Sequence, residues 1–335
     1  MIHERSNLKP DIWADFFNGS RLACARLITA VDNHPEWIPD ILDRLIPRQR
    51  GAIRIGVTGP PGVGKSTVTA ALARRANKAG HSVGVLAVDP TSPFSGGAFL
   101  GDRVRMQNLS DDGRIFIRSL ASREGHGGLS PSTPYAADVF DAFGLDRIFI
   151  ETVGVGQAEL DVLTCVDLTV LVLQPVTGDV IQALKAGILE VADLFFVNKA
   201  DLPGTDALLE SLKFLFEISR PREGRSVPPI LAASAREDRG VDEAYAEIER
   251  LIHGLIQSGR YDEKKQARLE REIQAAIRQC LWERYAAAAG APDEIRAVTE
   301  RLLRDRQSPF PYIRDMCARV KLELVKGRIG REKDE

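Results

Sequence analysis

One short segment constrains the fold of this 335-residue chain more than any other. It is the run Gly59-Pro60-Pro61-Gly62-Val63-Gly64-Lys65-Ser66-Thr67, which matches the phosphate-loop pattern G-x-x-x-x-G-K-[ST] at every fixed position. The apolar run Ile53–Thr58 before it predicts a strand, and the Ala- and Leu-rich run from Thr67 to Ala79 predicts a helix. Glycines let backbone N–H groups converge on a polyphosphate, and the helix N-terminus adds its positive dipole end. We therefore expect a phosphate site in which Lys65 reaches the outer phosphates and Ser66 ligates Mg²⁺.

Strand-like and helical runs alternate between residues 51 and 258. Most strand runs are continuously apolar, as expected of parallel strands that are covered on both faces. The predicted fold is therefore α/β, a doubly wound and mostly parallel P-loop sheet that binds its ligand at the C-terminal strand ends. Helical periodicity predicts an N-terminal helical extension over 1–50 and a C-terminal helical arm over 259–335. The expected strands are Ile53–Thr58, Ser82–Val88, Ile115–Leu120, Arg147–Thr152, Leu168–Gln174, Leu194–Asn198 and Pro229–Ala233.

Composition excludes few functions but favours some over others. Hydrophobic residues make up 44% of the chain, charged residues make up 27%, and the net charge is -2. These values are ordinary for a globular protein and give no reason to expect nucleic acid or an anionic membrane as a partner. The four cysteines are far apart, which predicts buried thiols in a reducing compartment. With no segment resembling a signal peptide or a membrane span, we expect a cytoplasmic protein.

Two further segments indicate which base the nucleotide carries. Asn198-Lys199-Ala200-Asp201 follows an apolar strand run and has the N-K-x-D pattern that G proteins use for guanine. The Asp201 carboxylate can accept hydrogen bonds from N1–H and the 2-amino group of guanine, whereas N1 of adenine is an acceptor and would leave the carboxylate unpaired. The Lys199 stem can lie on the base, and Asn198 can connect neighbouring loops. At Ser234-Ala235, which ends the last predicted strand, we expect a backbone N–H to meet the base oxygen.

Carboxylates at other strand ends are candidate metal ligands. Glu151 directly follows an apolar strand run and begins Glu151-Thr152-Val153-Gly154, where small G proteins have D-x-x-G. Glu151 can hold Mg²⁺, usually through water, and the N–H of Gly154 can meet the γ-phosphate. Asp89 ends another strand run, and Asp102 lies in the loop that follows. Both can reach the phosphate or Mg²⁺ side of the pocket, although each could instead serve as a turn or cap residue.

Together these segments resemble the methylmalonyl-CoA mutase-associated G-protein chaperones of the MeaB type, a family also labelled ArgK or LAO/AO transport ATPase. The resemblance covers nearly the whole chain, and its most specific parts are the glutamate at position 151 and the run 177–190. The matching segments are Val88-Asp89-Pro90-Thr91-Ser92-Pro93, Gly101-Asp102-Arg103, Glu151-Thr152-Val153-Gly154-Val155-Gly156-Gln157-Ala158-Glu159, Thr177-Gly178-Asp179-Val180-Ile181-Gln182-Ala183-Leu184-Lys185-Ala186-Gly187-Ile188-Leu189-Glu190 and Asn198-Lys199-Ala200-Asp201.

The resemblance implies a G domain with a C-terminal dimerisation arm, and hence a homodimer. It implies that GTP or GDP is bound with Mg²⁺ and that slow GTP hydrolysis is accelerated by a partner. That partner would be an adenosylcobalamin-dependent acyl-CoA mutase, whose cofactor loading and protection the GTPase gates; the cobalamin would lie on the mutase and not on this chain. By the same resemblance, Lys65, Ser66, Asp89, Asp102 and Glu151 belong to the phosphate–Mg²⁺ site, Asn198, Lys199 and Asp201 to the guanine site, and Asp179, Gln182 and Lys185 to an extra switch that contacts the mutase.

The segment 122–129 departs from the family pattern, because Glu124 and His126 interrupt it. A solvated loop position accounts for His126 better than acid–base chemistry does. The departure leaves open whether the client is methylmalonyl-CoA mutase or a related isobutyryl- or hydroxyisobutyryl-CoA mutase. The motifs also allow a nickel-insertion GTPase, which the five scattered histidines disfavour, a kinase or transport ATPase, which Asp201 disfavours, and a scaffold that binds nucleotide without hydrolysing it.

Overall fold

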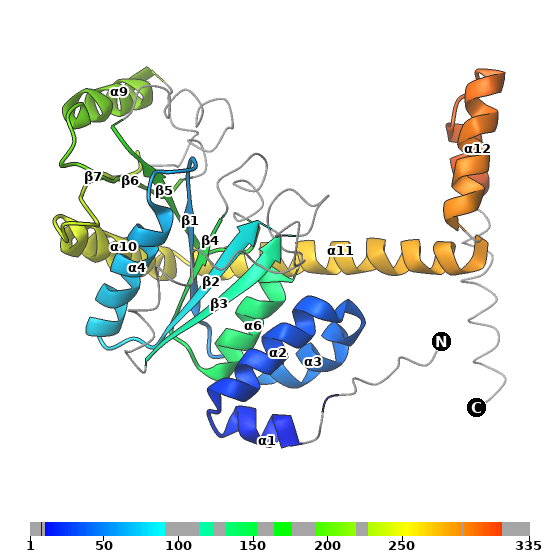
Figure 1. Cartoon of the computed structure of the whole chain (residues 1–335), viewed down its shortest axis with the longest axis horizontal. Helices are drawn as coiled ribbons and strands as arrows, with labels where there is room; N and C mark the ends of the chain where they lie inside the picture. The colour runs from blue at the N-terminus through cyan, green and yellow to red at the C-terminus, as the bar shows by residue number, and fades with distance from the viewer. Residues whose placement is uncertain are drawn as a thin grey trace. The chain divides into compact units, whose positions relative to one another are not determined.

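The computed structural model describes residues 8, 11–90, 114–122, 132–152, 164–175, 192–218, 227–289 and 291–316 (Figure 1). By its internal contacts the chain divides into two units, Met1–Lys265 and Gln266–Glu335. The division into 1–50, 51–258 and 259–335 stays a prediction. Within the ranges given above, the chain forms no helix with the length and apolar character that a membrane crossing requires.

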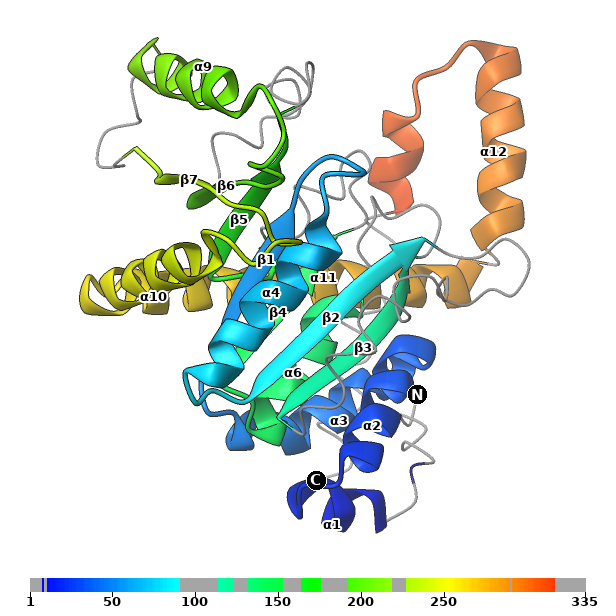
Figure 2. The same ribbon diagram turned by 60° about the vertical axis from the view of Figure 1, so that its left-hand side comes forward.

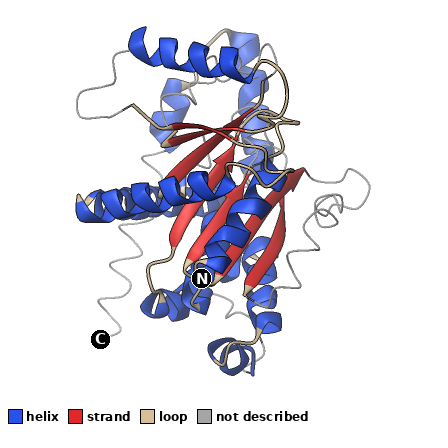
Figure 3. Cartoon of the chain, turned by 90° about the vertical axis from the view of Figure 1, so that its left-hand side faces the viewer, coloured by secondary structure: helices blue, strands red, loops and turns tan. Residues whose placement is uncertain are grey.

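A sheet of seven parallel strands is the centre of the first unit. The order across the sheet is β3-β2-β4-β1-β5-β6-β7, so the strand that precedes the phosphate loop lies in the middle. Figure 3 shows the twist of the sheet and the helices on both of its faces. The predicted doubly wound α/β fold is thereby confirmed. The strands are β1 (Ile53–Thr58), β2 (Val83–Pro90), β3 (Ile115–Ser122), β4 (Arg147–Glu151), β5 (Leu168–Leu173), β6 (Leu194–Val197) and β7 (Ile230–Ala232).

Some strand ends differ from the predicted ones, because backbone pairing with the neighbouring strand continues beyond the apolar run. β2 and β3 each continue two residues beyond the predicted end, because Asp89 pairs with Ala121 and Pro90 with Ser122 in the parallel register. β7 is shorter than predicted, and its burial is only partial. Hydrophobicity therefore locates each strand, while the neighbouring strand decides where it stops.

Helices cover the two faces of the sheet in separate hydrophobic clusters. α4 and α10 pack on one face, and α6 packs on the other face together with α1 to α3. α9 also lies on that second face, over β5 and β6. Gly84 in β2 allows the close approach of α6, since a Cβ there would lie 2.6 Å from the Phe140 ring. The helices are α1 (Asp11–Phe17), α2 (Arg21–Asn33), α3 (Ile38–Leu45), α4 (Lys65–Lys78), α6 (Thr133–Phe143), α9 (Thr205–Ile218), α10 (Val241–Gln257), α11 (Arg260–Ala289) and α12 (Ala291–Asp305).

The N-terminal helices share their core with the sheet unit. Phe16, Leu27 and Ile41 are fully buried in the same cluster as residues of α6 and β3. Polar contacts add to this packing, since the Arg21 guanidinium donates to the carbonyl of Ile115 at the start of β3. The expected N-terminal helices are therefore present, and they stabilise the outer strands of the sheet.

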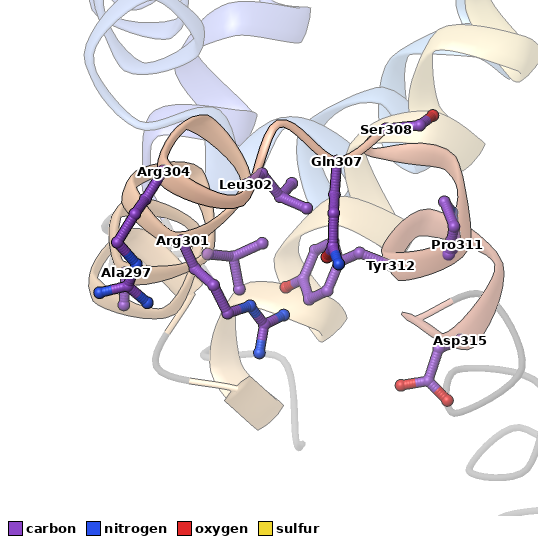
Figure 4. Close-up of a pocket in the computed structure, with 10 residues that line it drawn as sticks. Ala297, Arg301, Leu302, Arg304, Gln307, Ser308, Pro311, Tyr312 and Asp315 are labelled. Carbon is purple, nitrogen blue, oxygen red and sulfur yellow. The ribbon is translucent and has the colours of Figure 1, made fainter.

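The boundary between the units falls within α11, after Lys265. The second unit therefore contains α11 from Gln266 onward, then α12 and a helical segment at 310–316. Along α11, Leu269, Ile273 and Ile277 recur every four residues, and about half of each side chain is exposed. A hollow of about 1050 Å³ lies between α12 and the residues that follow it, with Arg301 and Tyr312 on its wall (Figure 4). No residue of the phosphate loop or the guanine signature lines this hollow, so it is not the predicted nucleotide site.

Candidate nucleotide site

The carboxyl ends of the parallel strands bring the predicted binding segments to one edge of the sheet. The loop that joins β1 to α4 lies at this edge (Figure 2). Glu151 ends β4, and Asn198 follows β6 directly. Ser234 comes two residues after β7. Since these strands are parallel, segments from widely separated parts of the sequence converge here, as expected of a doubly wound sheet.

The phosphate loop is held in a shape that only glycine permits at its first position. Gly59 has φ +144°, and a Cβ there would lie 2.2 Å from the carbonyl oxygen of Val172 in β5. Lys65, the first residue of α4, is buried, and its ammonium donates to the carbonyls of Gly59 at 2.9 Å and Pro60 at 3.1 Å. The ammonium therefore lies inside the loop, where a bound phosphate could replace these carbonyls as its acceptor.

The side chains of the loop face different surroundings. Pro61, Gly62 and Thr67 are exposed, whereas Val63 is fully buried in the core beneath the loop. Such a loop presents its backbone, rather than its side chains, to a ligand.

The predicted metal ligands Ser66 and Glu151 are in direct contact. The Ser66 hydroxyl donates to Glu151 Oε1 at 2.6 Å, and only 5% of Glu151 is exposed. Hard oxygen donors at the start of α4 and the end of β4 suit Mg²⁺, which prefers carboxylate and hydroxyl oxygens beside substrate phosphates. The residues present therefore fit this ion.

Asn198 and Lys199 fasten the guanine signature to the phosphate loop. Asn198 Nδ2 donates to the carbonyl of Val63 at 2.8 Å, and Lys199 Nζ donates to the carbonyl of Gly62 at 2.8 Å. Room for Asn198 exists because residue 64 is glycine, since a Cβ on Gly64 would lie 2.6 Å from Nδ2. Two consecutive side chains thus bind two consecutive carbonyls, which couples the phosphate loop to the segment predicted to bind guanine.

Asp201 lies in the exposed turn after β6, beside the loop that follows β7, since the N–H of its neighbour Ala200 donates to the carbonyl of Ala233 at 3.1 Å. The Ser234 hydroxyl is the main cause that lowers the pKa of the Asp201 carboxyl, with further lowering from the charges of Arg236 and Arg239. The carboxylate is therefore ionised at neutral pH and can act only as an acceptor. An acceptor is the group that the N1–H and 2-amino donors of guanine require.

The N–H groups of the Ser234–Ala235 segment already have protein acceptors. The Ala235 N–H donates to Asn198 Oδ1 at 3.1 Å, and the Ser234 N–H donates to the carbonyl of Arg239 at 2.9 Å. The expected contact of a backbone N–H with the base oxygen stays a prediction. It requires one of these groups to exchange or share its acceptor when the base binds.

Several predicted site residues lie outside the described part of the chain. For Asp89, the second-last residue of β2 at the same edge of the sheet, the structure describes only the backbone. The others are Asp102, Gly154, Asp179, Gln182 and Lys185, together with Glu124 and His126.

Sequence reasoning missed two contacts at this edge. Gln174, the first residue after β5, accepts a hydrogen bond from Lys199 Nζ at 2.6 Å. The hydroxyls of Thr58 and Thr152 bond to each other at 3.1 Å across the ends of β1 and β4. The rule that polar residues at strand ends converge could have identified both, although neither belongs to a recognisable motif.

Comparisons with known proteins agree with this nucleotide chemistry. The family model for the methylmalonyl Co-A mutase-associated GTPase MeaB matches residues 24–290. A Pyrococcus abyssi protein, described as a GTPase candidate, is 45% identical over 261 residues, which cover 77% of this chain and 81% of that protein. The mouse protein named methylmalonic aciduria type A homolog, mitochondrial, is 32% identical over 316 residues, which cover 89% of this chain and 76% of that protein.

Among solved structures, the LAO/AO transport system kinase matches with a TM-score of 0.70 and 25% sequence identity. The match covers 94% of this chain and 100% of that chain. The family model spans well over half of the sequence, and the two relatives cover more than two thirds of it. The resemblance deduced from the motifs is thus confirmed, and the chain is a P-loop GTPase that belongs to the family of methylmalonyl Co-A mutase-associated GTPases, MeaB.

Proposed function

We propose that this GTPase binds GTP with Mg²⁺ at the carboxyl edge of the sheet and couples hydrolysis to the loading of adenosylcobalamin into an acyl-CoA mutase. The observation that carries the nucleotide part is the position of Asn198. Its side chain bonds to Val63 in the phosphate loop and to Ala235 in the loop after β7, so one amide holds the phosphate end and the base end in register.

The chain's own groups support hydrolysis by in-line attack of water on the γ-phosphate. Lys65 and the backbone N–H groups of the phosphate loop would stabilise the charge that develops on the phosphate oxygens. Mg²⁺, held on the side of Ser66 and Glu151, would neutralise phosphate charge when bound. The group that orients the water is proposed to come from the extra switch, with Gln182 or Lys185 as candidates, and to reach the site only when the partner binds.

Guanine selection is proposed to rest on Asp201, and a change of one atom type tests it. Asp201→Asn replaces an acceptor with a group that can also donate. Xanthine carries a carbonyl where guanine carries its 2-amino group, so the variant should prefer XTP to GTP. We expect the GTP affinity to fall on the order of a hundredfold and the XTP affinity to rise, measured by calorimetry with Mg²⁺ present. An unchanged preference for GTP in the variant would remove Asp201 from base recognition.

The mutase as client is supported by the family name and by the name of the mouse relative. The test is co-purification with candidate mutases, namely those acting on methylmalonyl-, isobutyryl- and hydroxyisobutyryl-CoA, in the presence of GDP or of a non-hydrolysable GTP analogue. We expect one mutase to bind in a manner that depends on the nucleotide and to accelerate hydrolysis. Lys185→Ala should abolish that acceleration while intrinsic hydrolysis and GTP binding persist. Equal capture of all the mutases in both nucleotide states would contradict the proposal.

We further propose that the arm forms a homodimer through the apolar stripe on α11. Leu269, Ile273 and Ile277 are 53%, 50% and 54% exposed, and such a stripe on a helix is normally covered by a partner surface. Ile273→Glu should convert a dimer to a monomer in light scattering coupled to size-exclusion chromatography. Arg278→Glu, an exposed position on the same helix but on the side away from the stripe, is the control. A monomeric wild-type protein at micromolar concentration would refute the dimer.

A further inference from the structure

Two arginines of the sheet unit fasten α10 in place, one at its first turn and one near its middle. Arg147 in β4 binds Glu249 through Nε at 3.1 Å and through the terminal guanidinium nitrogen at 2.8 Å. Arg75 in α4 binds Asp242 in the same bidentate way, at 2.8 and 3.2 Å. α4 and α10 lie side by side on one face of the sheet (Figures 1 and 2). Bidentate pairs of this kind fix the orientation of both partners.

Arg75 has a second carboxylate partner. Its remaining guanidinium nitrogen lies 2.8 Å from Asp238, and the Arg75 side chain is only 13% exposed. Asp238 belongs to the turn between Ser234 and Arg239, which closes through two backbone hydrogen bonds between these residues, at 2.9 and 3.2 Å. One guanidinium therefore spans the start of α10 and the turn that carries the Ser-Ala segment of the guanine site.

The turn needs an external contact because its backbone is unusual. Asp238 has φ +59°, a left-handed conformation that is costly for residues other than glycine, although Asp and Asn tolerate it best. Gly240, just after the turn, has φ +73°, and a Cβ there would lie 2.8 Å from the carbonyl oxygen of Ala232. A residue held in such a conformation persists when its surroundings fix it, and Arg75 provides this contact.

Hydrogen bonds and an ion pair connect both ends of the turn to the phosphate loop or to the helix that follows it. At the start of the turn, the Ala235 N–H binds Asn198, which in turn binds the carbonyl of Val63. At its end, Asp238 binds Arg75, which lies on the helix that begins at Lys65 directly after that loop. Arg75 lies ten positions after Lys65 along this helix, a rise of about 15 Å. The turn is thus held by contacts with the phosphate loop at one end and with α4, the helix after that loop, at the other.

We infer that Arg75 is a positioning residue for guanine selection: by holding Asp238 it fixes the turn that places Ser234 beside Asp201. This inference rests on the proposed role of Asp201 in base recognition. Arg75 itself contacts no base. Its removal should leave the phosphate loop intact and allow the Ser234–Ala235 segment to shift, so that binding of guanine weakens while binding of the phosphates does not.

The chain offers matched controls that separate this role from simple anchoring of α10. Arg75→Gln removes both ion pairs, and Asp238→Asn removes only the pair with the turn, in a residue type that tolerates the left-handed backbone equally well. Asp242→Asn weakens only the pair with α10. Arg147→Gln removes the other bidentate clamp of the same helix. The probes are GDP and ADP with Mg²⁺, titrated calorimetrically, and thermal unfolding is recorded for every variant.

We expect Arg75→Gln and Asp238→Asn to lower the ratio of GDP affinity to ADP affinity on the order of tenfold, with ADP affinity unchanged. Asp242→Asn and Arg147→Gln should keep the wild-type ratio even where they lower the unfolding temperature. An unchanged ratio in both Arg75→Gln and Asp238→Asn would overturn the inference, and so would an equal loss in Arg147→Gln. If Arg75→Gln fails to fold, Asp238→Asn alone decides.

Failure of the underlying proposal has a different signature. A wild-type protein that binds GDP and ADP equally well has no guanine selection, and then the roles of Asp201 and Arg75 fall together. The wild-type protein could instead select guanine, with Asp201→Asn losing this selection and both Arg75→Gln and Asp238→Asn keeping it. That result would support the role of Asp201 and refute only the role of Arg75.

Discussion

The two edges of the sheet both carry buried polar side chains, but these side chains have different partners. At the amino edge, Arg54 and Asp138 form an ion pair of 2.6 Å, and both are buried. Asp141 there accepts the backbone N–H groups of Arg50 and Gly51 at 2.8 and 2.9 Å. Each of these three charged groups meets a fixed opposite charge or backbone dipole of the chain itself.

At the carboxyl edge the lysines bond to backbone carbonyls. Lys65 donates to carbonyls of its own loop, and Lys199 donates to one more of them and to Gln174. A carbonyl is a weaker partner for an ammonium than a phosphate is, so a ligand can take its place at modest cost. Burial is therefore common to both edges, but Arg54 pairs with a carboxylate, whereas Lys65 donates to carbonyls that a ligand could replace.

The largest expected effect is on stability at the amino edge. Asp138→Ala should cost about 3–5 kcal/mol of unfolding free energy, because it leaves the fully buried Arg54 guanidinium without its closest charge partner. Urea unfolding of the nucleotide-free protein measures this loss. In the folded protein, GDP affinity should equal that of the wild type. Asp138→Asn, which keeps an oxygen acceptor for Gln49, is the control and should lose less. A loss below about 1 kcal/mol for the alanine variant would place this pair among the weak surface pairs.

The next prediction concerns GTP hydrolysis and compares two lysines, each near the start of a helix, at opposite edges of the sheet. Lys65→Met should lower GTP hydrolysis on the order of 10²- to 10³-fold, since it removes the charge that is proposed to face the phosphates. Lys264→Met removes an ammonium that donates to the carbonyl of Asp167 at 2.5 Å and lies 3.5 Å from Asp193. It should cost about 1 kcal/mol of unfolding free energy and leave hydrolysis unchanged. Steady-state GTP turnover and urea unfolding of both variants test the pair. A loss of turnover in Lys264→Met would show that the edges are not functionally separate.

The parts of the fold that the sequence predicts are the local ones. The apolar runs place all seven strands, and the phosphate loop and N-K-x-D segment identify the binding edge, because each depends on residues close together in the chain. Arg54, the second residue of an apolar strand, also indicates a buried partner, although the sequence does not say which carboxylate it is. Local patterns thus give the elements and the chemistry of the site.

The contacts that hold the site together are not local and could not be predicted. Asn198 and Val63 are 135 positions apart, and Arg75 and Asp242 are 167 apart. Whether such residues meet depends on the strand order, for which the sequence contains no direct signal. On its helix, Arg75 has the pattern of an ordinary surface arginine until α10 is placed beside it.

The smallest expected effect is on the pH dependence of stability. The free energy of unfolding should depend on pH through Glu249 near the amino edge, whereas nucleotide affinity should not. Burial raises the pKa of Glu249, but hydrogen bonds from Arg147 and Tyr245 outweigh it, so the pKa lies below its ordinary value. The His81 ring, 3.9 Å away, lowers the pKa of Glu249 further by its electrostatic interaction with the carboxylate. Because the folded pKa is the lower one, the stabilisation by Glu249 is fully present above the unfolded pKa and disappears as the pH falls through the folded pKa.

Glu249→Gln should therefore lower the unfolding free energy by about 1 kcal/mol at pH 7, and this difference from the wild type should shrink below roughly pH 4.5. Urea unfolding at a series of pH values measures it. GDP affinity across the pH range in which both proteins are folded should be the same for the two, because Glu249 stabilises α10 at the edge opposite the proposed nucleotide site. A variant that lost GDP affinity in this range would show that Glu249 and Arg147 act on the site as well. The distinction between the edges would then rest on distance from the nucleotide rather than on the kind of partner.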